Sequence, residues 1–150
     1  MIKIRKARKN DFMNSLLIAR SLKEWFTKEA MENMKVDFYL NNLVVALEKK
    51  EVSGFLCYTS NNSIMHIIWF GVRKDSQRKG IGRGLLRWLI KESKKLKIRA
   101  IDVETLPDED NYEPYKLTRN FYYKNGFKRV AYKKARVKEW DDQIVLERVL

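Results

Sequence analysis

Hydrophobic and polar positions alternate along the chain in a pattern that predicts short strands and amphipathic helices. Residues 2–8 alternate apolar with charged side chains, as in a half-buried strand. A helical spacing of apolar residues follows, beginning after Asn10 or Asp11, either of which can serve as the N-cap. The helical pattern continues unevenly to Met34, so we expect a strand followed by two helices with a break between them.

The middle of the chain is richer in strands. An apolar stretch at 43–47, a turn at 49–51 and a second apolar stretch at 52–58 indicate a β-hairpin. After another turn at 61–63 comes segment 64–72 (IMHIIWFGV), the most apolar strand in the chain. We expect this strand to be covered on both faces.

The C-terminal half alternates helices with strands. From Gly80 to Leu96, apolar residues follow helical spacing opposite a row of Arg and Lys, which predicts an amphipathic helix. The elements expected after it are a strand, an acidic loop, a short helix capped by Gly126 and two closing strands, at 98–105, 107–114, 116–125, 127–137 and 143–150. The order β-α-α-β-β-β-α-β-α-β-β contains too many hairpins for a doubly wound parallel sheet, so we predict an α/β fold with a mixed sheet.

The composition fits one globular domain spanning residues 1–150. Apolar residues make up 45% of the chain and charged residues 34%, which differs from the composition of disordered chains. The formal net charge of +13 attracts phosphates, nucleic acid, anionic membranes and acidic proteins alike. Enrichment in Lys and Glu, with two prolines and one cysteine, is also typical of hyperthermophile proteins. The charge therefore indicates either an anionic partner or thermal adaptation.

Side-chain counts argue against two classes of site. Cys57 is the only cysteine and His66 the only histidine, so we expect neither an internal disulfide nor a zinc-type ligand cluster. No window reaches the ~18 consecutive apolar residues of a membrane span. The charged start also lacks the apolar region of a signal peptide. We expect a soluble cytoplasmic protein without a metal or membrane contact.

The segment from Gln77 to Gly84 joins the most apolar strand to the amphipathic helix and carries three glycines. Glycine lets the backbone approach a ligand closely, and free N–H groups at a helix start favour an anion such as a pyrophosphate. A dinucleotide fingerprint would need glycine where Leu85 stands, and a P-loop would end in Gly-Lys-Ser/Thr. Neither pattern fits, which leaves another kind of phosphate-binding turn or a basic turn without a ligand.

Residues Gln77–Gly82 (QRKGIG) resemble the acyl-CoA-binding signature Gln/Arg-x-x-Gly-x-Gly/Ala of the GNAT (GCN5-related N-acetyltransferase) superfamily. Residues 120–127 (NFYYKNGF) resemble that superfamily's second motif, a short helix carrying Phe-Tyr-x-x-x-Gly-Phe. The resemblance is specific over residues 64–130 and rests on element order outside them. It implies the acyl-CoA N-acyltransferase fold, a mixed and centrally splayed β-sheet flanked by helices. It also implies transfer of an acetyl group from acetyl-CoA to a primary amine of a protein or small molecule by direct attack.

The resemblance also implies a set of site residues. Tyr122 matches the tyrosine that protonates the departing thiolate, unless it is only a half-buried aromatic residue. The backbone from Val72 to Lys74 would hold the pantetheine arm, and the turn would hold the pyrophosphate. Many members carry Asn where this chain has Tyr115, so the CoA contact of that Asn is in doubt here. The residues expected to bind acetyl-CoA are Val72, Arg73, Lys74, Gln77, Arg78, Lys79, Gly80, Ile81, Gly82, Arg83 and Gly84.

The general base is left open. His66 shares a strand face with Val72, and it lies six residues before Val72, where the histone-acetyltransferase branch places its catalytic glutamate. An imidazole can accept a proton at neutral pH, although a lone histidine on an apolar strand is more often structural. Glu104, at the end of the next strand, is the rival. Many members deprotonate the amine through ordered water instead.

Other features allow two interpretations each. The acidic loop 107–114 attracts a cationic amine or is simply solvated. Trp25, Phe26, Met31 and Met34 line an acceptor pocket or pack in the core. The protein is an acetyltransferase, or a basic nucleic-acid or ribosome-associated binding module without turnover, although no standard recognition motif is evident. A homodimer is also open, because many relatives dimerise.

Overall fold

The computed structural model describes residues 1–150, which divide into two compact units. The first unit comprises residues 1–59 and 67–92, and the second comprises residues 60–66 and 93–150. Strand β4 (Ile64–Val72) and helix α3 (Ile81–Lys95) each contribute residues to both units. That residues 1–150 act as one domain stays a prediction.

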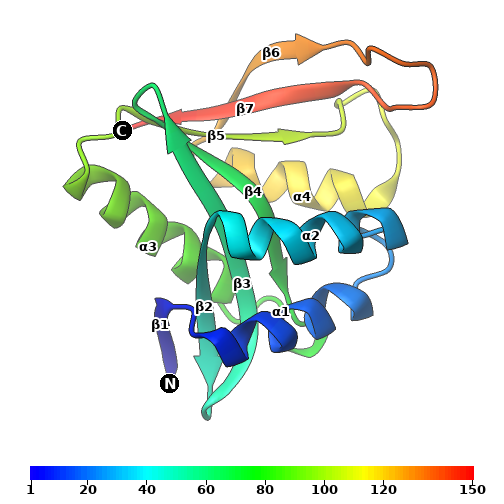
Figure 1. Cartoon of the computed structure of the whole chain (residues 1–150). Coiled ribbons are helices and arrows are strands. Elements are labelled where there is room, and N and C mark those ends of the chain that lie inside the picture. The colour runs from blue at the N-terminus through cyan, green and yellow to red at the C-terminus, as the bar shows by residue number, and fades with distance from the viewer. The chain divides into compact units, whose positions relative to one another are not determined.

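The first unit is built around strands in the order β1-β2-β3-β4. The pairs β1·β2 and β2·β3 are antiparallel. Helices α1 and α2 lie side by side (Figure 1), and the short 3-10 helix η1 connects β4 to α3. The bounds are β1 (Ile2–Lys6), α1 (Lys9–Ser21), α2 (Lys28–Leu40), β2 (Asn42–Glu48), β3 (Glu51–Asn61) and η1 (Lys74–Ser76).

The start of α1 is fixed by a carboxylate. Asp11 accepts a hydrogen bond from the backbone N–H of Arg8 at 2.7 Å and pairs with Arg5 at 2.6 Å. The helix begins at Lys9, so Arg8 is the N-cap residue. Asp11 lies in the first turn of the helix and accepts the hydrogen bond from the backbone N–H of Arg8. The sequence-based expectation of an N-cap at Asn10 or Asp11 is therefore wrong.

The core of the first unit forms on both faces of β3, because successive side chains of a strand point to opposite faces. Phe55 packs edge-on against Phe38 of α2 with ring centroids 5.6 Å apart, and both residues are buried. On the other face, a Cβ at Gly54 would lie 3.0 Å from Ile81 of α3. A Cβ at Gly71 of β4 would lie only 2.8 Å from the Phe55 ring, so this position requires glycine. Helices α2 and α3 thus cover opposite faces of β3, and the end of β4 fits closely against the core.

The second unit contains the first residues of β4, followed in the sheet by β5, β7 and β6. Strand β7 is antiparallel to both β5 and β6. The core of the second unit includes Ile101, Ile144 and Leu146, which are all fully buried. Strand β6 is exposed along its whole length. The bounds are β5 (Ala100–Thr105), α4 (Glu113–Lys124), β6 (Lys128–Lys133) and β7 (Gln143–Val149).

The observed order of helices and strands is the order predicted from the sequence, with η1 as an addition, so the α/β class is confirmed. The expectation that β4 is covered on both faces is wrong. Met65, Ile67 and Gly71 are buried, but the other residues of the strand, such as Phe70 and Val72, are only partly buried. In β4 one face is therefore covered and the other is partly accessible.

Candidate active site

The turn between η1 and α3 combines two left-handed residues with a helix N-terminus. Arg78 has φ +66° and Gly80 has φ +84°. The N–H of Gly84 donates to the carbonyl of Gly80 at 2.9 Å as the helix begins. The N–H groups of a first helical turn have no acceptors within their helix and lie at its positive dipole end. Because no atom lies within 4 Å of the position that a Gly80 side chain would take, the turn offers open space and donors that fit a pyrophosphate.

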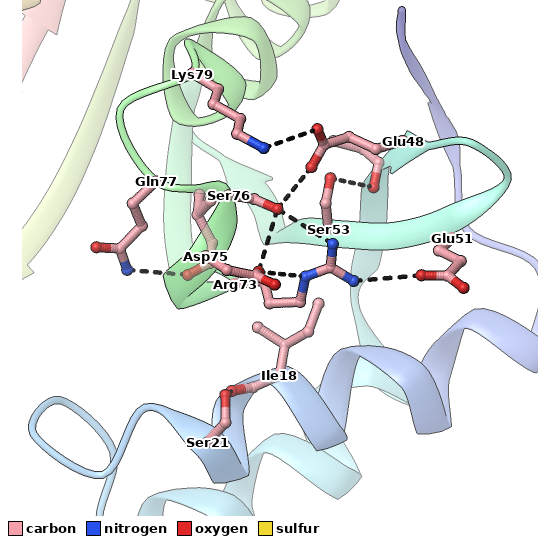
Figure 2. Close-up of polar contacts among 12 residues, drawn as sticks. Ile18, Ser21, Glu48, Glu51, Ser53, Arg73, Asp75, Ser76, Gln77 and Lys79 are labelled. Atoms are coloured by element: carbon pink, nitrogen blue, oxygen red, sulfur yellow. Dashed lines mark hydrogen bonds and ion pairs between the residues drawn. The ribbon is translucent and has the colours of Figure 1, made fainter.

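The basic side chains predicted to bind acetyl-CoA fall into two groups. Arg78 and Arg83 are exposed and carry no ion pair. The other three are held by carboxylates of the same unit. Figure 2 shows the pairs Arg73–Asp75 (2.7 Å), Arg73–Glu51 (3.6 Å) and Lys79–Glu48 (3.8 Å). Lys74 pairs with Glu24 at 3.3 Å. Arg78 and Arg83 are therefore the cations of this segment that are free to meet a phosphate.

Polar groups at the end of β4 are partly engaged within the protein. Gln77 donates its side-chain amide to the carbonyl of Val72 at 3.0 Å (Figure 2). The N–H of Arg73 donates to the carbonyl of Ser53 in β3 at 2.8 Å. In this geometry the Gln77 side chain stabilises the turn. The pantetheine contacts expected from Val72 to Lys74 stay predictions.

Tyr122 lies in α4 with its ring in the core of the second unit. The residue is 3% exposed, and its ring packs edge-on against Phe127 with centroids 5.1 Å apart. Gly126, with φ +88°, ends the helix, and the N–H of Phe127 donates to the carbonyl of Tyr122 at 3.1 Å. The glycine and phenylalanine of the second motif thus fix the tyrosine ring. Burial raises the pKa of the Tyr122 phenol, which therefore stays protonated at physiological pH.

Both ring nitrogens of His66 have partners in the second unit. Nδ1 lies 2.5 Å from Oδ1 of Asp102, and Nε2 lies 2.8 Å from Oδ1 of Asn61. Both ring nitrogens therefore contact polar side chains of the protein itself rather than standing open to an amine. The arrangement favours the structural interpretation of this histidine over that of a general base.

Glu104 is also engaged. Its Oε1 lies 2.5 Å from Nζ of Lys133, and the side chains are 49% and 59% exposed. A carboxylate that is half exposed and paired with a lysine resembles an ordinary solvated residue at a strand end. Both candidate bases are thus engaged by neighbouring side chains, Glu104 through one carboxylate oxygen only, and their catalytic roles stay predictions.

Two arginines of the second unit bind the acidic loop 107–114 through a hydrogen bond and ion pairs. Arg119 is 3% exposed and donates to the carbonyl of Asp110 at 2.9 Å. Arg129 pairs with Asp108 at 3.0 Å and with Glu109 at 2.8 Å. These contacts favour a structural loop over an attractor for a cationic amine. The buried arginine could not be predicted, because nothing local in the sequence distinguishes Arg119 from a solvated helix residue.

The aromatic and methionine residues of the α1–α2 region pack in the core of the first unit. Met34 is fully buried, and Phe26 lies 6.1 Å from Trp69 between ring centroids. Trp25 and Met31 are partly buried against the same apolar cluster. Core packing is therefore the better interpretation of this group.

The structure also bears on metal binding and membrane insertion. No group of three or more His, Cys, Asp or Glu side chains is placed to hold a metal ion. No helix combines the length and the apolar character that crossing a membrane requires. Cys57 is buried, which raises the pKa of its thiol to about 12, so it is not a thiolate nucleophile at neutral pH.

Residues 19–129 match the family model described as acetyltransferase (GNAT) domain. A search of curated proteins found no match.

Solved structures resemble the chain over its whole length. A GNAT-family acetyltransferase structure from Desulfovibrio desulfuricans is 24% identical, covers 99% of both chains and gives a TM-score of 0.86. The PaiA N-acetyltransferase of Thermoplasma acidophilum, solved with coenzyme A, is 19% identical over 100% of this chain and 99% of its own, with a TM-score of 0.78. The ribosomal-protein-S18-alanine N-acetyltransferase of Escherichia coli is 16% identical over 99% and 94%, also with a TM-score of 0.78. These similarities confirm the predicted acyl-CoA N-acyltransferase fold, with its mixed, centrally splayed sheet.

Proposed function

Because the chain belongs to the acetyltransferase (GNAT) family and is on that ground an acetyl-CoA-dependent N-acetyltransferase, we propose that the turn from Gln77 to Gly84 binds the CoA pyrophosphate. The observation that carries the proposal is the open left-handed turn at Arg78 and Gly80, which leads into the N-terminus of α3. Arg78 and Arg83 add two unpaired positive charges. The family membership favours the enzyme over a binding module without turnover.

The reaction proposed is direct attack of an amine on the thioester. The nitrogen lone pair forms a bond to the acetyl carbonyl carbon, and the carbonyl electrons move onto oxygen. When the tetrahedral intermediate collapses, the carbon–sulfur bond breaks and its electron pair leaves with the CoA sulfur. The amine loses a proton and the thiolate gains one, so an acetamide and CoA–SH are released.

Tyr122 is proposed to supply the proton or hydrogen bond that the departing thiolate needs. Its phenol is protonated because burial raises its pKa, and its ring is held by Phe127. A neutral donor held in a fixed position stabilises the developing negative charge without having to reorganise.

The amine proton is proposed to leave through water, because both candidate bases are engaged. His66 is bound by Asp102 and Asn61, and Glu104 is paired with Lys133. Profiles of kcat/KM against pH for His66→Ala and Glu104→Ala test this step. Both variants are expected to retain the acidic limb of the wild type, and loss of that limb in one variant alone would identify that residue as the base.

The acceptor is proposed to be a primary amine of a protein or a small molecule, and the reaction to take place in the cytoplasm. A similar structure belongs to an enzyme named for the alanine of a ribosomal protein, which supports including protein N-termini in an acceptor screen. Thiol release can be measured for a panel of peptide N-termini, lysine peptides, polyamines, aminoglycosides and small amines. Release with one acceptor class supports the proposal, whereas no release with any amine, together with no CoA binding, would contradict it. Two further partners are proposed, a second copy of the chain in a homodimer and a nucleic acid or the ribosome.

A further inference from the structure

The phosphate-binding turn contains backbone strain that must be offset elsewhere. Arg78 has φ +66°, and a residue with a Cβ in the left-handed region costs about 1–2 kcal/mol. Strained residues persist only where the surrounding structure holds them in place. Contacts that hold the turn are therefore needed on both sides of Arg78.

Glu48, at the end of β2, is the group that reaches both sides of this residue. Its Oε1 accepts a hydrogen bond from Oγ of Ser76 at 2.6 Å, and its Oε2 lies 3.8 Å from Nζ of Lys79 (Figure 2). Ser76 precedes Arg78 and is fully buried, and Lys79 follows it and is more than half exposed. The two oxygens of one carboxylate therefore connect both ends of the strained segment to the sheet of the first unit.

Ser76 links the carboxylate to a second anchor. Arg73 donates from its guanidinium to Oγ of Ser76 at 3.3 Å and to Asp75 at 2.7 Å (Figure 2). Its backbone N–H donates to the carbonyl of Ser53. Ser76 thus accepts from Arg73 and donates to Glu48, which fixes the position of its hydroxyl. The hydrogen bond from Ser76 is also the main reason that the pKa of Glu48 is lowered.

We propose that Glu48, acting through Ser76 and Lys79, is a positioning residue that holds the turn in the conformation that receives the CoA pyrophosphate. A carboxylate close to a pyrophosphate repels it, so a purely electrostatic role would weaken binding. The presence of the Glu48 carboxylate at this position is instead explained by the hydrogen bond that it accepts from Ser76. The inference rests on the proposed function of the turn.

The two roles of Glu48 can be separated by two substitutions. Glu48→Ala removes both the hydrogen bond and the charge, whereas Glu48→Gln retains an oxygen that can accept from Ser76. Ser76→Ala removes the same hydrogen bond from the other side with little change in volume. Glu51→Gln is the matched control, because Glu51 is 77% exposed and pairs with Arg73 at 3.6 Å without touching Ser76.

The test compares two acetyl donors. Steady-state rates are measured with acetyl-CoA and with S-acetylpantetheine, which lacks the pyrophosphate. Glu48→Ala and Ser76→Ala are expected to raise KM for acetyl-CoA about tenfold with kcat within about twofold of wild type. Their rates with S-acetylpantetheine should equal those of the wild type. Glu48→Gln should stay within about threefold of wild type, and Glu51→Gln should not differ from it.

Three outcomes would overturn the inference. An unchanged KM for acetyl-CoA in Glu48→Ala and Ser76→Ala would show that the turn does not depend on this contact. Equal losses with both donors would indicate general damage, which urea unfolding of the two variants would reveal independently. A wild-type enzyme that does not distinguish the two donors would contradict the phosphate site itself, and so separates failure of the proposed function from failure of this inference.

Discussion

Tyr122→Phe is the substitution that isolates the proposed chemistry from binding. It removes one oxygen atom and keeps the ring that packs against Phe127 at a centroid distance of 5.1 Å. The residue is 3% exposed, so the phenol oxygen is removed from a site from which water is largely excluded. The pyrophosphate turn lies in other elements of the chain and is left intact.

The magnitude follows from the strength of the lost interaction. A hydrogen bond to a charged group contributes about 1.5–3 kcal/mol. If Tyr122 donates that bond only when the thiolate forms, kcat should fall by about 10- to 150-fold. The KM for acetyl-CoA should stay within about twofold, because an interaction made only in the transition state contributes nothing to ground-state binding.

The assay is thiol release at saturating acceptor, with CoA affinity measured separately by calorimetry. Tyr123→Phe is the matched control, because Tyr123 is the neighbouring residue of α4 and its phenol donates to Asp108 at 2.8 Å. That variant loses a loop contact and should keep kcat within about twofold of wild type. If Tyr122→Phe retains wild-type kcat, or changes only KM, the assignment of Tyr122 to the departing thiolate is wrong.

Three further predictions concern stability and the turn. Gly71→Ala places a Cβ 2.8 Å from the Phe55 ring and should lower the free energy of unfolding in urea by about 1–3 kcal/mol; no loss would mean that β4 shifts freely. Gly80→Ala meets no atom within 4 Å but must adopt φ +84°, so CoA binding should weaken by about 5- to 30-fold; unchanged affinity would contradict the left-handed turn. Because the Ser76 hydrogen bond lowers the pKa of Glu48 below its ordinary 4.5, the stabilisation is present above that pH and is lost as the pH falls through the lowered value. Thermal unfolding of the wild type should therefore be more sensitive to acid than that of Glu48→Gln, and parallel curves would argue against the contact.

Local patterns account for the part of the fold that was predicted. The element order depends on periods of two and 3.6 residues within each segment, and these are visible in a single sequence. The turn before α3 was predicted because glycines and a helix start are also local features. Coverage of β4 was mispredicted, because the apolar run 64–72 does not reveal which neighbours cover each face.

The candidate site was predicted less completely, because its polar contacts join distant parts of the chain. His66 meets Asp102 across 36 positions, and Ser76 meets Glu48 across 28. A basic residue in a glycine-rich segment looks the same in sequence whether it faces a ligand or a carboxylate. Only the folded chain distinguishes Arg78, which is unpaired, from residues such as Lys79.

The most direct test of the central claim is a ¹H–¹⁵N spectrum of the protein titrated with CoA and, separately, with pantetheine. If the turn binds the pyrophosphate, CoA should shift the amide resonances of Gly80, Gly82 and Gly84, and pantetheine, which lacks the phosphates, should leave all three in place. CoA that binds without moving these three resonances would contradict the account.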